Sequence, residues 1–384
     1  MKGAATLSNP TVAVIGGGAI GLAVAWRLAQ RGAKVTVFDK DAAGSGATHA
    51  AAGMLAACAE AEPGEENLVA LNRASQLLWP AFTEELGKAA GMSIGLRTEG
   101  TLVLALTADD QARLKHLLTF QNSLGLPLEW ISATEVRRRE PHLAPTIAGA
   151  IWSPEDHQVD NRALAAALHR AALASGVTVR EHTSVDQIVS EHGRATGLSA
   201  GGSKVAADVV VVAAGAWSRG IGGLPMEARP PVRPVKGQML SLRMDPKAPL
   251  LNHVVWAPGA YLVPRRDGRL LVGATVEEKG FDTTLTAGGQ LALLEAAWRA
   301  VPAIEELAID EMWVGFRPGS RDDAPIIGQA PLPGLVYATG HYRNGILLTP
   351  ITAKAIANLI LDGAVDPLVQ PFGLERFAPA MAAE

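Results

Sequence analysis

The chain has 384 residues, of which 48% are hydrophobic and 19% charged, and its net charge is −4. This length suffices for two domains with separate cores, and the composition is typical of a soluble α/β enzyme. The small negative charge, without a long basic run, argues against a nucleic acid partner. The single cysteine, Cys58, excludes an internal disulfide and fits a reducing cytoplasm. We expect it to be a small buried residue, not a nucleophile.

Residues 11–26 form an uncharged apolar run, but it is shorter than the ~20 residues that a bilayer requires. Four glycines interrupt the run and Arg27 ends it. The first ten residues contain no apolar core of their own, so we predict no signal peptide. We therefore expect a cytoplasmic protein without an integral membrane segment.

The stretch 12–39 predicts a dinucleotide site. Its apolar runs, 12–15 and 35–38, are typical of two strands with a helix between them. The glycines that open the helix have the spacing G-x-G-x-x-G and are Gly16, Gly18 and Gly21. Such glycines give a tight turn, close backbone approach to a pyrophosphate, and close helix packing. The helix N-terminus offers free N–H groups to the diphosphate. Asp39 stands where an acid can accept the hydrogen bonds of an adenosine ribose.

The segment 44–60 is rich in glycine and alanine, so its backbone is expected to lie close to something flat or crowded. Two interpretations are open: a flexible loop, or a helix over residues 50–57 packed tightly on a ligand. Further along, the run 209–212 predicts a strand that ends in Ala-Gly-Ala around Gly215. That ending indicates backbone beside a cofactor or an ordinary tight turn.

The remaining elements follow from apolar periodicity and turn signals. Helices are predicted around 71–82, over 109–124, from the N-cap Asp160 to just before Gly176, over 288–300, and after Pro350. Strands are predicted over 94–106, 147–152, 177–179, 185–188 and 335–338, and a final pair of strands is expected on either side of 317–328. The region 232–310 is β-rich, and Asp267-Gly268 marks a hairpin in an antiparallel sheet.

Nucleotide-binding elements thus occur at the start, middle and end of the chain. We predict an α/β fold in which a Rossmann-like domain is discontinuous and an antiparallel-sheet substrate domain of α+β type is inserted into it. The expected segments are 1–85, 146–220 and 310–384 for the nucleotide-binding domain, and 86–145 and 221–309 for the substrate domain.

Five motifs carry a resemblance that spans essentially the whole chain. They are VIGGGAIGLAVAWRLA, GATHAAAGM, VVVAAGAWS, FRPGSRDDAPIIG and GHYRNGILLTP. In this order they resemble the D-amino-acid oxidase superfamily of flavoproteins, and within it the glycine oxidases of thiamine biosynthesis. The resemblance implies FAD as the cofactor, not NAD, and a homo-oligomer.

The resemblance also implies the residues that contact FAD. They are Gly16, Gly18, Ala19, Ile20, Gly21, Asp39, Lys40, Ala47, Thr48, Ala52, Gly53, Met54, Val185, Gly215, His341, Tyr342, Arg343, Asn344, Gly345, Ile346 and Leu347. Residues 341–347 would follow the flavin's pyrimidine edge at a helix N-terminus. Backbone N–H groups there stabilise the negative charge of reduced flavin.

Three residues match family positions at the substrate. Arg317 would hold the substrate carboxylate through a two-bond fork, which suits a planar, always-charged guanidinium. Its alternative is a surface ion pair with Asp322 or Asp323. Tyr261 would share the carboxylate, although an isolated tyrosine is more often a core aromatic. Arg343 would lie near the substrate entrance, or would only order the flavin loop.

Two departures from the family pattern concern the substrate pocket. Gly259 stands where the bacterial type has a histidine, and Val276 where a methionine is expected. N-substituted glycines such as sarcosine or iminodiacetate therefore compete with glycine as substrate, and a dicarboxylate would draw its second cation from Arg343. His49 is one residue out of register for covalent flavin attachment, and Cys58 is not at the attachment position of monomeric sarcosine oxidases. We expect non-covalent FAD and no metal.

The resemblance implies hydride transfer from a small amino acid or secondary amine to the flavin, with O2 as electron acceptor and hydrogen peroxide as product. Glycine would give glyoxylate through an imine, and small D-amino acids are further candidates. A dehydrogenase of the same fold, passing electrons to a quinone or an electron-transfer protein, is the alternative. A flavin-binding module without catalysis is a more distant one.

Overall fold

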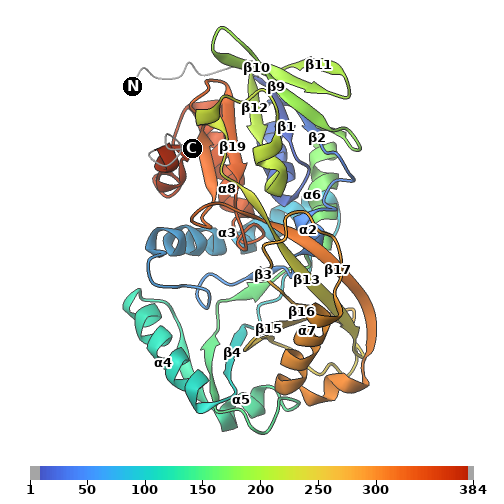
Figure 1. Cartoon of the computed structure of the whole chain (residues 1–384), viewed down its shortest axis with the longest axis vertical. Coiled ribbons are helices and arrows are strands. Elements are labelled where there is room, and N and C mark those ends of the chain that lie inside the picture. Colours follow the sequence, from blue (N-terminus) through green and yellow to red (C-terminus); the bar gives the residue numbers. More distant parts are fainter. Residues whose placement is uncertain (1–8, 379–384) are drawn as a thin grey trace.

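The computed structural model describes residues 9–378 and shows two sheets one above the other (Figure 1). The six-stranded sheet consists, in spatial order, of β18 (Ile326–Gln329), β19 (Leu335–Thr339), β12 (Val209–Val212), β1 (Thr11–Ile15), β2 (Lys34–Phe38) and β8 (Thr178–Arg180). All neighbours run parallel except β18 and β19. This parallel sheet confirms the Rossmann-like part of the predicted fold class.

Both faces of the six-stranded sheet are covered, which explains its nearly continuous apolar strands. Successive side chains of β1 point to opposite faces. Val12 and Val14 pack into the core formed with the helices, and Ala13 and Ile15 pack into a second core. The helices are α1 (Ala19–Gln30), α3 (Glu66–Ala90), α6 (Asn161–Ala174) and α8 (Thr349–Asp362). The opposite face carries a small sheet, β9 (Val185–Glu191), β10 (Arg194–Ala200) and β11 (Ser203–Ala206).

The eight-stranded sheet forms the other half of the molecule (Figure 1). Its order is β17 (Ala308–Gly319), β13 (Arg233–Arg243), β16 (Arg269–Gly273), β15 (Ala260–Pro264), β14 (Val254–Ala257), β4 (Thr101–Ala105), β6 (Gly149–Ser153) and β5 (Glu129–Ser132). The sheet is antiparallel, as predicted, except for the parallel pair β14–β4. The turn at Asp267-Gly268 joins β15 to β16, as expected. Its helices are α4 (Ala108–Ser123), α5 (Ala133–Arg139) and α7 (Ala287–Ala300).

The remaining elements are short. They are α2 (Ala47–Ala50), the strand pair β3 (Met54–Leu55) and β7 (His157–Gln158), and the 3₁₀ turns η1 (Gly215–Gly220), η2 (Met226–Ala228), η3 (Pro302–Glu306), η4 (Gln370–Phe372) and η5 (Leu374–Phe377). The helix considered over residues 50–57 is wrong, because α2 ends at Ala50. Beyond it, the Gly53 carbonyl accepts the Val159 N–H at 2.9 Å, and Gly53 has a φ of +71°. The backbone there bonds to distant segments, so no helix can continue.

Two further sequence expectations need correction. The strand predicted over 94–106 is confined to β4, because Gly95 and Gly100 adopt positive φ before it begins. The strands on either side of 317–328 do not pair with each other: β17 belongs to the eight-stranded sheet and β18 to the six-stranded one. The chain therefore crosses between the two halves after β17 ends at Gly319.

The domain division stays a prediction, but two of its boundaries differ from the sheet assignments. β6 pairs with β4 and β5, and β17 pairs with β13, so both lie in the eight-stranded sheet. The predicted segments 146–220 and 310–384 assign β6 and most of β17 to the nucleotide-binding part instead. Within residues 9–378, no helix is long and apolar enough to cross a membrane.

Candidate cofactor and substrate site

A cavity of about 570 Å³ lies between the two sheets and brings together residues far apart in the sequence. Of the residues predicted to contact FAD or substrate, all line this cavity except Gly21. Gly21 has another task, because a Cβ there would stand 1.9 Å from the Gly16 carbonyl oxygen. It allows helix α1 to pack closely on the turn after β1.

The turn after β1 is built for close backbone approach. Gly16 has a φ of +106°, and a Cβ on it would stand 2.4 Å from the Ala213 carbonyl oxygen at the end of β12. A side chain at Gly16 is excluded twice, by conformation and by space. The turn opens directly into the cavity at the N-terminus of α1, where a diphosphate is favoured.

Two side chains hold this turn. The Thr48 hydroxyl accepts the Ala19 N–H at 2.9 Å, which satisfies one free donor at the start of α1. The Asp39 carboxylate accepts the Gly17 N–H at 2.7 Å and the Asp41 N–H at 2.9 Å. Burial raises the pKa of Asp39, and the two N–H groups oppose that rise. Asp39 thus orders the glycine turn in addition to facing the cavity.

Aromatic side chains that sequence reasoning did not single out cover one side of the cavity. Trp217 and Phe316 line it, and Phe281 stacks on Trp217 with ring centroids 5.0 Å apart. The Lys40 ammonium lies 4.4 Å from the Trp217 ring centroid, within cation–π range. The contacts join the end of β2 to β17, so no local pattern could have revealed them.

The predicted flavin loop, residues 341–347, leads into α8, and two side chains of α3 donate hydrogen bonds to its last residue. Ser75 and the Trp79 indole both donate to the Leu347 carbonyl, at 2.6 and 2.9 Å. His341 is buried beside Thr352, with 3.1 Å between its Nε2 and the threonine hydroxyl. Burial lowers the pKa of His341 to about 3, so the ring is neutral at physiological pH.

Arg317 and Tyr261 meet at the eight-stranded sheet, where glycines make room for both. A Cβ on Gly237 would stand 2.6 Å from the Arg317 guanidinium, and one on Gly273 would stand 2.7 Å from the Tyr261 hydroxyl. Arg317 Nη1 donates to the Thr275 carbonyl at 3.1 Å, which orients the guanidinium. Burial raises the pKa of Tyr261 and the nearby charge of Arg317 opposes that rise.

The alternative ion pair for Arg317 is not formed. Asp322 pairs with Arg376 at 2.8 Å, and Asp323 with Arg233 at 3.3 Å. Among residues 9–378, the structure gives Arg317 no carboxylate partner. Its charge faces the cavity, as a carboxylate clamp requires.

Arg343 differs in this respect. Its Nε lies 3.3 Å from Glu60 and its Nη2 lies 3.6 Å from Glu65. Glu60 lines the cavity, and sequence reasoning did not mark it. The expectation that Arg343 supplies a spare cation for a dicarboxylate is therefore not supported, since two carboxylates already offset its charge.

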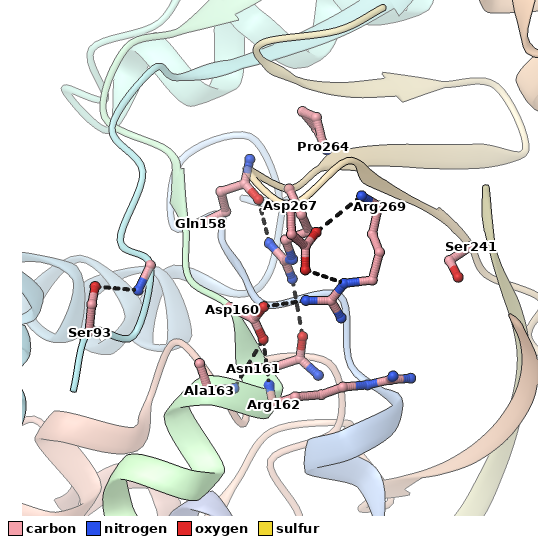
Figure 2. A network of polar contacts seen from close by, with 12 residues as sticks. Ser93, Gln158, Asp160, Asn161, Arg162, Ala163, Ser241, Pro264, Asp267 and Arg269 are labelled. Carbon is pink, nitrogen blue, oxygen red and sulfur yellow. Dashed lines mark hydrogen bonds and ion pairs between the residues drawn. The ribbon is translucent and has the colours of Figure 1, made fainter. Parts of the chain in front are cut away.

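A buried arginine, Arg265, holds the loop after α2 in place. Its Nη2 donates to the Ala52 carbonyl at 2.6 Å and to the Asn161 side chain at 3.1 Å, and its Nη1 to Gln158. Figure 2 shows the neighbouring part of this network, in which Arg269 joins Asp160 and Asp267 at 2.6 and 2.8 Å. Asp160 is also the N-cap of α6, as predicted. The network ties the eight-stranded sheet to the segment that lines the cavity.

The two residues considered for covalent attachment are not among those that line the cavity. His49 is absent from it, although its neighbours Thr48 and Ala50 are part of it. Cys58 is buried, and burial raises the pKa of its thiol. Both observations favour the predicted non-covalent cofactor.

The glycine turn, the α1 N-terminus and the cavity that continues to Arg317 fit an extended dinucleotide, and comparison with known proteins decides which one. The model of the FAD dependent oxidoreductase (DAO) family matches residues 11–359. The chain belongs to the DAO family. It is therefore an FAD-dependent oxidoreductase, which confirms the predicted cofactor and enzyme class.

Individual DAO relatives agree along the whole chain. It is 40% identical over 371 residues to the glycine oxidase of Geobacillus kaustophilus, covering 95% of this chain and 96% of that protein. The crystal structure of glycine oxidase from that organism has a TM-score of 0.88, with 96% and 99% of the two chains covered. These matches confirm the predicted resemblance and fold class.

Two other relatives bear on function. The chain is 41% identical to the bifunctional protein ThiO/ThiG of Synechocystis sp., with 95% of this chain but only 54% of that protein covered. It thus spans about half the length of this relative. The structure of iminodiacetate oxidase from Chelativorans sp. BNC1 matches with a TM-score of 0.86 and 30% identity, covering 94% and 98% of the two chains.

Proposed function

We propose that this DAO-family protein oxidises glycine or a small N-substituted glycine such as sarcosine or iminodiacetate, with small D-amino acids as further candidates. Bound FAD supplies a hydride acceptor, and the oxidised amine hydrolyses to glyoxylate or another 2-oxo acid. O2 is the proposed electron acceptor, with hydrogen peroxide as the product. The single observation that carries the proposal is that Arg317 and Tyr261 line the same cavity as the residues predicted to contact FAD.

The residues have separate proposed roles. Arg317 and Tyr261 bind the substrate carboxylate, which fixes the α-carbon relative to the flavin. The glycine turn, Asp39 and Thr48 hold the nucleotide part of FAD. The loop 341–347 directs the N-terminus of α8 at the flavin, and the neutral His341 adds no charge there.

We also propose a pathway, a cellular compartment and an oligomeric state for this protein. The ThiO/ThiG relative supports a role in thiamine biosynthesis. The single cysteine supports a reducing cytoplasm. The resemblance to glycine oxidases supports a homo-oligomer.

A screen with the purified yellow protein tests the activity. Glycine, sarcosine, iminodiacetate and D-alanine are each added anaerobically, and flavin bleaching is followed by absorbance. We expect bleaching by at least one of them and peroxide formation after air is admitted. Bleaching without peroxide would support the dehydrogenase alternative. Absence of bleaching by all four would refute the proposed substrate class.

A further inference from the structure

A buried carboxylate that was not among the predicted site residues lines the cavity. Glu60 lies in the segment between β3 and α3, with only 11% of its side chain exposed, and it lines the same cavity as Arg317 and Tyr261. Its Oε2 is buried and receives no hydrogen bond within residues 9–378, although Arg343 Nε stands 3.3 Å away. A buried carboxylate oxygen without a donor is costly unless a ligand provides one.

The backbone around Glu60 is fixed by other buried groups. Asp156 accepts the N–H groups of Cys58 and Ala59 at 3.0 and 2.7 Å. Gln121 donates to the carbonyls of Ala59 and Ala61, at 3.2 Å each. The Glu60 side chain contributes to neither set of bonds. Its position is therefore set in advance by neighbours, and its charge can be changed without removing these contacts.

The two arginines of the cavity lining differ in their surroundings. Burial raises the pKa of Tyr261, the charge of Arg317 opposes that rise, and the charge of Glu60 adds to it, so both charges act on this tyrosine. Within residues 9–378 Arg317 has no acidic partner, so its charge is available to attract a carboxylate. Arg343 is offset by Glu60 and Glu65, and its end presents a hydrogen-bond acceptor.

We propose that Glu60 determines specificity at the amine end of the substrate, where it accepts a hydrogen bond from the substrate nitrogen and repels a second carboxylate. This inference rests on the proposed function. It assigns glycine or sarcosine, which carry one carboxylate and one amine, as better substrates than iminodiacetate. Arg343 then serves mainly to hold Glu60 in place.

The charge of Glu60 changes near neutral pH, so the proposal predicts that discrimination against a second carboxylate depends on pH. Burial raises the pKa of Glu60 to about 7, and Arg343 opposes that rise. The carboxylates of Asp156, Glu65 and Glu62 add to the rise. Below pH 7, Glu60 becomes neutral and its repulsion of a second carboxylate fades.

Sarcosine and iminodiacetate make a matched test, because both are secondary amines and they differ by one carboxylate. The measured quantity is kcat/KM for iminodiacetate divided by that for sarcosine. We expect Glu60→Gln to raise this ratio about tenfold or more at pH 8 by removing a like charge at short range. The wild-type ratio should rise as pH falls from 8 to 6, and the Glu60→Gln ratio should stay flat.

Glu62→Gln is the matched control, since it removes the same charge two residues away at an exposed position. At pH 8 it should leave the ratio as in wild type, because loss of the Glu62 charge favours the charged form of Glu60 that already prevails there. Thermal unfolding and the flavin spectrum of each holoenzyme show whether the variants fold and retain FAD. An unchanged ratio in Glu60→Gln, or an equal change in Glu62→Gln, would overturn the inference.

A binding measurement separates failure of this inference from failure of the proposed function. Glutarate and butyrate are carbon isosteres of iminodiacetate and sarcosine, and their binding to the oxidised holoenzyme is followed by perturbation of flavin absorbance. Glu60→Gln should tighten glutarate about tenfold and leave butyrate nearly unchanged. This result would uphold the repulsion even if no amine were oxidised. Equal effects on both acids would refute it.

Discussion

The two ends of the cavity are built in different ways. The nucleotide end is formed mainly by backbone: a turn in which Gly16 and Gly21 leave no room for a Cβ, and the N-terminus of a helix that follows directly. The substrate end is formed by side chains from segments far apart, namely Arg317 on β17, Tyr261 on β15, and Glu60 before α3. A backbone site binds what the fold family binds, whereas a side-chain site can change its substrate by single substitutions. The following variants test this contrast.

The largest effect is expected at Arg317. Arg317→Lys replaces a planar fork by a point charge, so a substrate carboxylate loses one of two hydrogen bonds. Breaking a buried charged pair costs ~3–5 kcal/mol, so kcat/KM should fall at least about a hundredfold.

FAD content should not change in Arg317→Lys, because the residue acts at the substrate end. Acetate should inhibit wild type competitively and the variant much less. Near-normal efficiency together with unaltered acetate inhibition would remove the clamp from Arg317. The contrast between the two ends would then lose its main support.

Sequence reasoning succeeded where the signal was local. The strand–glycine turn–helix unit, the N-cap Asp160 and the Asp267-Gly268 hairpin each lie within a few residues, and the structure confirms all three. Arg317 and Tyr261 were found only through family resemblance, since nothing in their own segments distinguishes them from surface or core residues.

The remaining parts depend on long-range packing. Glu60 pairs with Arg343, which belongs to a segment near the other end of the chain, so no local pattern marks it. A glycine inside a strand, such as Gly237, ordinarily weakens it, but here the Arg317 side chain occupies the space of its Cβ. Likewise, residues 50–57 have good helix formers, but Arg265 and Val159 take their backbone groups. Tertiary contacts overrode local propensity there.

Asp39 tests the nucleotide end. Asp39→Ala removes the proposed ribose acceptor and also the partner of the Gly17 N–H. Leaving such buried groups unpaired costs ~1–3 kcal/mol, which corresponds to about 5–150-fold weaker FAD binding. Titration of the apoprotein with FAD, followed by flavin fluorescence, measures the change. At saturating FAD, the KM for substrate should remain as in wild type. A changed KM would mean that the two ends are not independent.

Gly237 offers a subtler test of the substrate end. Gly237→Ala places a methyl group where the Arg317 guanidinium now lies, so the arginine must shift. A displaced clamp should lower kcat/KM about tenfold, mainly through KM, with FAD binding intact. Gly288→Ala is the control, since a Cβ there meets nothing within 4 Å. Equal kinetics in the two variants would show that the space around Arg317 is not critical.

The smallest effect concerns His341 at the junction of the two ends. Because burial lowers its pKa to about 3, the folded protein holds this ring neutral, while the unfolded chain protonates it near its ordinary value of 6.5. The stability that depends on the neutral ring is complete above pH 6.5 and is lost as pH falls from there toward 3. The loss is at most roughly 1.4 kcal/mol per pH unit for one proton.

His341→Gln, which can still bond to Thr352, should remove this dependence. The free energy of unfolding of both holoenzymes, measured by denaturant titration from pH 7.5 to 5.5, gives the difference. Parallel pH curves would show that the ring takes up its proton within the folded protein, and hence that the loop 341–347 opens to water.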